Sequence, residues 1–258
     1  MTGFEGRTAL VTGAGRNIGR AIALAFADAG SNVGIIVNSS RAEADAVAAE
    51  VEARGRRAVV ATGDVGDPVA CERMVGEVVQ ALGPVDYLVN NAARRPRQAF
   101  LDITVEDWDQ LISSNLSSVF YLSRLVLPSM VERKFGRIIN IGGPDGLHGF
   151  RLRAHNVACK AGLVGLTKAI ALEFGPYGIT ANLVVPGIMN TSREEKDYPD
   201  IQRIIAGLGE QQQRSEIAIP RPGEPEEMAN AVMFFASEKS SYLTSQTVYV
   251  AGGLFGLP

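Results

Sequence analysis

Short apolar runs alternate with longer amphipathic stretches along most of the chain. The short runs are apolar at nearly every position, which predicts buried strands, and the longer stretches repeat their apolar residues at helical spacing. The predicted strands are Thr8–Thr12, Asn32–Val37, Ala58–Ala61, Val85–Val89, Arg137–Ile141, Thr180–Val185 and Thr247–Val250. The predicted helices are Ile18–Ala29, Arg41–Arg54, Pro68–Leu82, Val105–Arg133, Ala154–Phe174 and Glu226–Ala236.

Regular alternation of strand and helix predicts an α/β fold. Because the strands are apolar on both faces, they fit a doubly wound parallel sheet flanked by helices on both faces. No repeat or linker divides residues 1–258, so a single domain is expected. The helix over 105–133 is expected to be interrupted or kinked near Pro128. The unpatterned stretch 187–221 is too long for a simple connection, and we expect a substrate loop or lid there.

Composition excludes several classes of partner. The 25 Lys+Arg and 28 Asp+Glu give a net charge of −3, which offers no electrostatic reason to bind nucleic acid or anionic lipid. No apolar run has the length of a membrane span, and the N-terminus lacks the apolar core of a signal peptide. Two distant cysteines, Cys71 and Cys159, form neither a disulfide framework nor a metal site. A cytoplasmic protein without a metal is expected.

A glycine-rich loop joins the first predicted strand to the first helix. It reads Thr12-Gly-Ala-Gly-Arg-Asn-Ile-Gly19. Gly13 and Gly15 let the backbone turn and approach a phosphate, and Gly19 permits close packing of helix on strand. The free N–H groups at the start of the helix favour an anion. The loop therefore predicts a dinucleotide site, with Arg16, Asn17 and Ile18 contributing to it.

The end of the second strand indicates which dinucleotide is preferred. An NAD site places a carboxylate there for the ribose 2′-hydroxyl, but this chain has Asn38, Ser39 and Ser40. Arg16 lies in the glycine loop and Arg41 follows the strand, so charge-assisted donors are available for a 2′-phosphate. NADP(H) is therefore favoured over NAD(H), although the serines are equally suited to capping the next helix.

The loop and the later motifs resemble the short-chain dehydrogenase/reductase family, closest to its 3-oxoacyl-carrier-protein reductase branch. The resemblance covers essentially the whole chain and implies a Rossmann-type fold, a small-molecule carbonyl or hydroxyl substrate, and a homotetramer. Asn17 departs from the glycine usual in the family, but asparagine tolerates positive φ. The further positions that resemble cofactor-contacting residues of the family are Asp64, Val65, Asn91, Ala92, Ala93, Pro186, Gly187, Ile188 and Thr191.

The catalytic pattern of the family is broken in this chain. Asn115 resembles the family's helix asparagine, and Lys160 resembles its catalytic-helix lysine, which also binds ribose. The family places a tyrosine, its general acid/base, four residues before that lysine and a serine thirteen before the tyrosine. Those positions hold Asn156 and Gly143, neither of which exchanges a proton near pH 7. Ordinary carbonyl reduction would lose roughly 10²–10⁴-fold from the missing acid alone.

Few side chains are available to replace the lost groups. His148 and Asp145 lie in the predicted loop 143–153, which borders the substrate pocket in this fold, and a histidine there could act as acid/base. A plain surface histidine is the simpler interpretation of His148. The amide of Asn156 could polarise a carbonyl without transferring a proton.

Four neighbouring side chains have a structural explanation as well as a functional one. His155 adjoins Asn156 but points about 100° away from it on a helix. Cys159 lies one turn further on, where a buried packing thiol is its common role. Arg151 and Arg153 could hold a substrate carboxylate or phosphate, or could simply be solvated.

Three hypotheses fit these residues. The first is an NADP(H)-dependent oxidoreductase with an altered proton relay. The second is a non-redox enzyme on the same scaffold, such as a lyase, isomerase or dehydratase. The third is an inactive cofactor-binding or regulatory protein. The retained glycine loop, Asn115 and Lys160 favour the first, narrowly.

Overall fold

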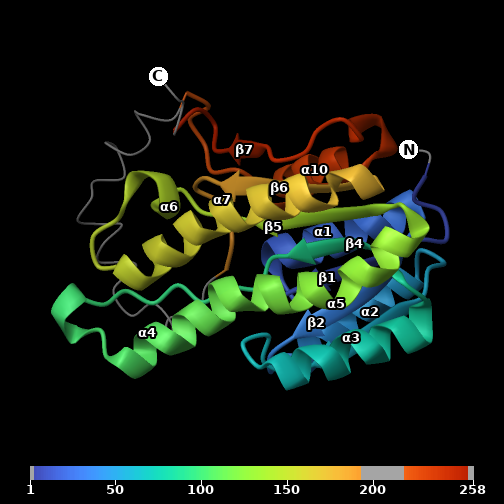
Figure 1. Cartoon of the computed structure of the whole chain (residues 1–258), viewed down its shortest axis with the longest axis horizontal. Helices are drawn as coiled ribbons and strands as arrows, with labels where there is room; N and C mark the ends of the chain where they lie inside the picture. Colours follow the sequence, from blue (N-terminus) through green and yellow to red (C-terminus); the bar gives the residue numbers. More distant parts are fainter. Residues whose placement is uncertain (1–2, 193–217, 255–258) are drawn as a thin grey trace.

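The computed structural model describes residues 3–192 and 218–254, and within them seven parallel strands form one central sheet (Figure 1). The strand order is β3-β2-β1-β4-β5-β6-β7, so the chain winds outward in both directions from β1 and β4. The strands are β1 (Thr8–Thr12), β2 (Asn32–Val37), β3 (Ala58–Thr62), β4 (Val85–Asn90), β5 (Gly136–Ile141), β6 (Ile179–Pro186) and β7 (Thr247–Val250). The predicted doubly wound fold is confirmed.

Helices cover both faces of this sheet. One apolar core joins the sheet to α1, α2 and α10, and a second joins it to α3, α5 and α7. The α-helices are α1 (Asn17–Ala29), α2 (Arg41–Glu52), α3 (Pro68–Leu82), α4 (Val105–Ile112), α5 (Ser118–Arg133), α6 (Asp145–His148), α7 (Ala154–Phe174) and α10 (Pro225–Ala236). In Figure 1, α4 and α6 lie at the same end of the molecule.

The two cores follow from the pleat of the strands. Successive side chains of a strand point to opposite faces. In β1, Leu10 packs in the core beneath α3, α5 and α7, whereas Ala9 and Val11 pack in the core beneath α1, α2 and α10. A strand that contributes to both cores must be apolar at every position, which explains the continuous apolar runs of the sequence.

The helix expected over 105–133 is broken at a different place from the one predicted. A π-helical turn at Ser113–Ser117 separates α4 from α5, and Pro128 lies inside α5. The serine hydroxyls explain the position, because Ser114 Oγ donates to the Gln110 carbonyl and Ser118 Oγ donates to the Ser114 carbonyl. Such bonds compete with regular helical pairing, and π-turns are frequent at functional sites.

The remaining predicted elements are present with ends shifted by a few residues. For example, α2 ends at Glu52, not at Arg54, and α1 begins one residue before Ile18. The predicted loop 143–153 contains the short helix α6. Of the predicted lid at 187–221, residues 193–217 lie outside the described part of the chain. In the described residues, no helix is long and apolar enough to cross a membrane.

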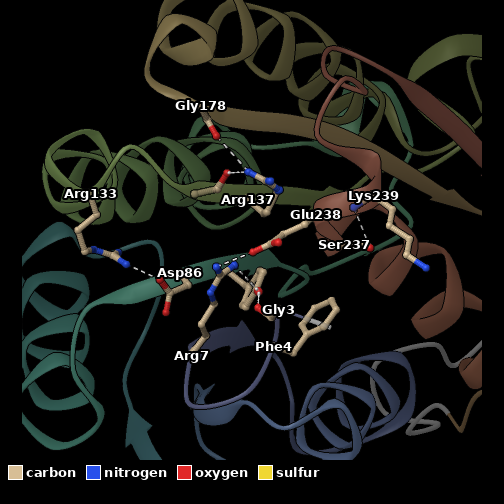
Figure 2. A network of polar contacts seen from close by, with 12 residues as sticks. Gly3, Phe4, Arg7, Asp86, Arg133, Arg137, Gly178, Ser237, Glu238 and Lys239 are labelled. Atoms are coloured by element: carbon tan, nitrogen blue, oxygen red, sulfur yellow. Dashed lines mark hydrogen bonds and ion pairs between the residues drawn. The ribbon is translucent and has the colours of Figure 1, made fainter. Parts of the chain in front are cut away.

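A polar and aromatic cluster holds together the end of the sheet where β1 and β4 begin (Figure 2). Tyr87 Oη accepts a hydrogen bond from Arg7 and donates one to the Gly3 carbonyl (2.9 Å). The Arg7 guanidinium also pairs with Glu238 (2.6 Å) and lies 3.7 Å from the centre of the Phe135 ring. These contacts join the N-terminal segment to the C-terminal part, at the opposite end of β1 from the glycine loop.

Candidate active site

The carboxyl ends of β1 and β4 are tied together at the glycine loop. Thr12 Oγ1 accepts hydrogen bonds from the backbone N–H groups of Asn91 and Ala92, each at 3.0 Å. The Asn91 amide donates to the carbonyl oxygens of Thr12 (2.9 Å) and Gly13 (3.2 Å). These bonds satisfy backbone N–H and C=O groups at and beyond the ends of the strands, and they hold the loop in one conformation.

Two glycines are required by the shape of this loop. Gly13 has φ of +65°, which side chains rarely allow. A Cβ on Gly19 would lie 2.2 Å from the Gly13 carbonyl oxygen, so only glycine fits there. No side chain of the described residues caps the N-terminus of α1. Its first N–H groups and positive dipole end therefore suit a phosphate.

Asn17 has a function in the loop that the sequence did not reveal. Its φ is +52°, consistent with the expectation that asparagine tolerates this conformation. Its side-chain Nδ2 donates to the Ser192 carbonyl (2.9 Å), and its Oδ1 accepts from the Ser192 backbone N–H (3.1 Å). A glycine could make neither bond. Asn17 thus connects the glycine loop to the segment that follows β6.

A cleft of about 810 Å³ lies along this edge of the sheet. Most of the predicted cofactor residues line it: Gly13, Gly15, Arg16, Asn17, Ile18, Gly19, Asn38, Ser39, Ser40, Asp64, Val65, Asn91, Ala92, Ala93 and Thr191. Lining residues that the sequence did not single out are Glu43, Gly63, Arg94, Arg95, Pro96, Gln110, Ser114 and Ser192. The cleft extends from the end of β2 to the segment after β4.

The remaining predicted cofactor positions, Lys160 among them, do not line this cleft. Pro186 ends β6, and a Cβ on Gly187 would lie 2.6 Å from the Ala251 Cα, so Gly187 serves close packing beside β7. Ile188 lines a separate cavity of about 430 Å³ with Arg221 and Tyr249.

The end of the cleft near β2 holds both charges and hydroxyls. Arg16 lies 4.0 Å from Glu43, a carboxylate that the sequence analysis overlooked. Arg41 is turned to Asp45 on its own helix, at 2.8 Å. Of the two arginines expected near a 2′-phosphate, only Arg16 lines the cleft.

Asn115 connects the π-turn to the segment after β4. Its Oδ1 accepts from the Arg94 backbone N–H (2.9 Å), and its Nδ2 donates to the Arg94 carbonyl (2.6 Å). The same Nδ2 lies 3.3 Å from Asn156 Oδ1. The π-turn is what presents this buried amide to both α7 and the cleft wall.

Asn156 belongs to a buried polar network in place of the family's tyrosine. The side chain is 1 % exposed, and its Nδ2 donates to Asp145 Oδ2 at 2.8 Å. The same carboxylate oxygen accepts from Arg153 at 2.9 Å, and both charged side chains are nearly buried. One N–H of the Asn156 amide is therefore engaged, and the amide has a second N–H donor. The sequence named all three residues but did not predict that they pair.

Lys160 lies next to Gly143 and beneath this network. Its Nζ donates to the Ile141 carbonyl at 2.9 Å, and a Cβ on Gly143 would lie 3.3 Å from the Lys160 Cγ. Burial, and to a smaller extent the positive charge of Arg95, lowers the pKa of Lys160 to about 8. The nearby Asp145 carboxylate acts in the opposite direction.

The depressed pKa of Lys160 predicts a pH-dependent stability difference. The folded state holds the proton of Lys160 less tightly than the unfolded chain does, whose lysine pKa is 10.5. Burying the charged ammonium group therefore lowers the unfolding free energy by the full amount below pH 8, and this penalty disappears as the pH rises toward 10.5. In Lys160→Met this penalty is absent. Relative to wild type, the variant should therefore lose about 3 kcal/mol of unfolding free energy between pH 7.5 and 10.5. Urea denaturation at several pH values measures the difference, and a constant difference would contradict the low pKa.

The other proposed replacements are placed less favourably. His148 is exposed on α6 and does not line the cleft. His155 is buried, its Nδ1 accepts from the Asn156 backbone N–H, and burial lowers its pKa. Burial also raises the pKa of Cys159 to about 11, so its thiol stays protonated near neutrality. Arg151 is exposed on the loop after α6.

Comparison with known proteins identifies relatives along the whole chain. The family model described as enoyl-(acyl carrier protein) reductase matches residues 13–255. The 3-oxoacyl-(acyl-carrier-protein) reductase FabG of Staphylococcus epidermidis RP62A is 37% identical over 96% of this chain and 99% of its own length. The FabG of Escherichia coli K12 is 38% identical over 98% of both chains.

A solved structure gives the same assignment. A protein of Sinorhizobium meliloti 1021, assigned to the short-chain alcohol dehydrogenases, superposes with a TM-score of 0.90 and is 30% identical. The similarity covers 98% of each chain. Fold, motif order and relatives agree, and the chain belongs to the short-chain dehydrogenase/reductase family.

Proposed function

We propose that this chain is an NADP(H)-dependent oxidoreductase that reduces or forms a carbonyl group with a proton relay lacking tyrosine. The observation that carries the proposal is the cleft at the glycine loop, where a Cβ on Gly19 would strike the Gly13 carbonyl. Gly19 lets α1 pack closely on the loop, and the positive φ of Gly13 with the N–H groups of the first turn of α1 suits a phosphate at this point of the cleft. Gly13, Ile18 and Gly19 would hold the pyrophosphate of the cofactor.

The relay proposed here uses Lys160 directly. A nicotinamide cofactor supplies the hydride when bound. Lys160 Nζ has three N–H donors, of which the Ile141 carbonyl takes one, so the ammonium group retains donors for a substrate oxygen. In the reduction, the Lys160 ammonium gives its proton to the carbonyl oxygen and becomes a neutral amine, which solvent reprotonates. A pKa of about 8 suits a proton donor near neutral pH.

Asn156 supports this relay by orienting the carbonyl. Its free amide N–H can donate to the carbonyl oxygen, while Asn115 and Asp145 fix the other sides of the amide. Gly143 places no side chain beside Lys160, where the family has a serine. The site thus replaces a hydroxyl pair by an ammonium and an amide.

A turnover assay tests the function. Purified protein is incubated with NADPH and a panel of ketones, aldehydes and 3-oxoacyl esters while the absorbance of the reduced cofactor is followed. Turnover that falls by about 10²–10⁴-fold in Lys160→Met supports the relay. Equal turnover in Lys160→Met would refute it, and tight binding without any turnover would favour a binding protein.

The preference for NADP(H) is a separate prediction. Arg16 and the hydroxyls of Ser39 and Ser40 line the cleft at the end of β2, where Asn38 stands in place of a carboxylate. Calorimetric titration should show that NADPH binds at least tenfold more tightly than NADH, because one charge-assisted contact contributes about that factor to the affinity. Arg16→Gln should remove most of that difference. Equal affinities would show that Glu43 cancels the charge of Arg16.

We also propose that the chain forms a homotetramer. Phe120 on α5 is 50% exposed and Leu172 on α7 is 78% exposed, so both long helices retain apolar side chains outside the core. Such side chains are available for contacts with another subunit. Sedimentation at micromolar concentration distinguishes a tetramer from the 27.4 kDa monomer.

A further inference from the structure

The arginines of the described residues differ in whether they have an acidic partner. Several have one, as Arg20 has Glu50, Arg54 has Asp28 and Arg16 in the cleft has Glu43. Arg95 lines the cleft and is half-buried, yet its guanidinium makes no hydrogen bond or ion pair with any described residue. Because a guanidinium desolvated without a partner is costly, Arg95 is a candidate for binding an anion that enters the cleft.

The backbone around Arg95 is held firmly in place. Asn115 binds both the N–H and the C=O group of Arg94. Two residues beyond Pro96, the Gln98 N–H donates to the Leu152 carbonyl at 2.8 Å. The segment is therefore anchored on both sides of Arg95, and this anchoring keeps the guanidinium in the cleft wall at little entropic cost.

Arg95 is also close enough to Lys160 to disfavour its ammonium form. The two positive charges thus repel each other, and this repulsion raises the free energy of the site when no anion is bound. The one buried carboxylate nearby, Asp145, already has Arg153 at 2.9 Å and the Asn156 amide at 2.8 Å. Asp145 therefore does not neutralise the charge of Arg95. Arg94 adds a further positive charge to the same wall of the cleft.

We propose that Arg95 binds an anionic group of the substrate, a carboxylate or a phosphate, next to the reacting carbonyl. The inference rests on the proposed function and specifies its substrate class: a small oxo acid or an oxo phosphate, not a neutral ketone. A guanidinium presents parallel N–H donors that match either anion. The anion also compensates the repulsion between Arg95 and Lys160. Arg153, which with Arg151 could also hold such an anion, has Asp145 as a partner at 2.9 Å.

Calorimetry on the protein saturated with NADP⁺ tests the proposal without requiring turnover. Two matched pairs of probes are titrated: acetoacetate against its methyl ester, and dihydroxyacetone phosphate against dihydroxyacetone. We expect at least one anion to bind about tenfold or more tightly than its neutral partner. In Arg95→Gln this advantage should disappear, while the affinity for the neutral partner stays unchanged. Arg95→Lys should keep part of it, because the charge remains and the fork is lost.

Arg54→Gln is the matched control. It removes one positive charge from an arginine that pairs with Asp28 and does not line the cleft. Its anion affinity should equal that of the wild type. If Arg54→Gln and Arg95→Gln weaken the anions equally, the effect is one of net charge and the proposal is wrong.

Two further outcomes separate the possible sources of the anion. If Arg95→Gln weakens NADP⁺ tenfold and leaves the probe anions unaffected, Arg95 binds a cofactor phosphate and the proposal is overturned. Equal binding of every anion and its neutral partner also overturns it. Selective anion binding together with no NADPH turnover would instead leave the anion site intact and refute the redox function.

Discussion

Gly19→Ala is expected to abolish measurable NADPH binding and to destabilise the fold. The added methyl carbon would lie 2.2 Å from the Gly13 carbonyl oxygen and 2.7 Å from the Asn91 amide nitrogen. Both neighbours are fixed to Thr12 and to each other, so relief requires α1 to move away from the loop. Such overpacking costs roughly 1–3 kcal/mol or more. Displacing the helix N-terminus should weaken NADPH at least a hundredfold.

Gly76→Ala is the control for this change. Gly76 lies inside α3, and a Cβ there would meet nothing within 4 Å. Alanine should therefore stabilise the helix by about 0.5–1 kcal/mol and leave NADPH affinity unchanged. Calorimetry and thermal unfolding of both variants provide the comparison. Normal NADPH affinity in Gly19→Ala would mean that the cleft is not a phosphate site.

The double change Asn156→Tyr and Gly143→Ser is expected to restore little ketone reduction, although it recreates the family's pair of hydroxyls. Asn156 is 1 % exposed and lies between Asn115 and Asp145, so a phenol ring has no space there. It would displace Asp145 from Asn156 and disturb the Asp145–Arg153 pair. Breaking a buried pair costs about 3–5 kcal/mol. A serine Cβ at 143 would press on the Lys160 Cγ as well.

Adding Asp145→Ala and Arg153→Gln to the double change tests that explanation. These substitutions remove the pair as a unit and open room beside the tyrosine. Ketone reduction should then rise by about 10²–10⁴-fold over the double variant, the usual value of a general acid. A full gain in the double variant alone, in the same NADPH assay, would show that the site has merely lost its hydroxyls and has not been rebuilt.

Much of the fold could be predicted because its signals are local. The ends of Pro68–Leu82 and Ala154–Phe174 agree with the structure, since a proline, glycines and helical spacing mark them. The break at Ser113–Ser117 was misplaced at Pro128, because a proline is a stronger local signal than hydroxyls that act through the backbone. The run Ser-Ser-Asn-Leu-Ser-Ser was the available clue.

The candidate site was predicted less completely than the fold. The positions of Asn115, Asn156 and Lys160 in the sequence identified them as site residues. Which side chains form hydrogen bonds or ion pairs depends on distances, and these could not be read from the sequence. Asp145 and Arg153 are separated by α6 and a turn, and only the packing of α6 on α7 brings them together. A Cβ on Gly146 would lie 2.4 Å from the Lys160 carbonyl carbon, so this glycine is what permits that packing.

The most direct test of the account is the transfer of deuterium from NADPH labelled at the nicotinamide C4 position. Protein is mixed with one equivalent of each labelled cofactor epimer and an oxo acid that binds selectively through Arg95, and the product is examined by mass spectrometry. We expect one epimer alone to deliver deuterium to the carbinol carbon, and Lys160→Met to slow this transfer by about 10²–10⁴-fold. Tight NADPH binding with no deuterium in any product would contradict it.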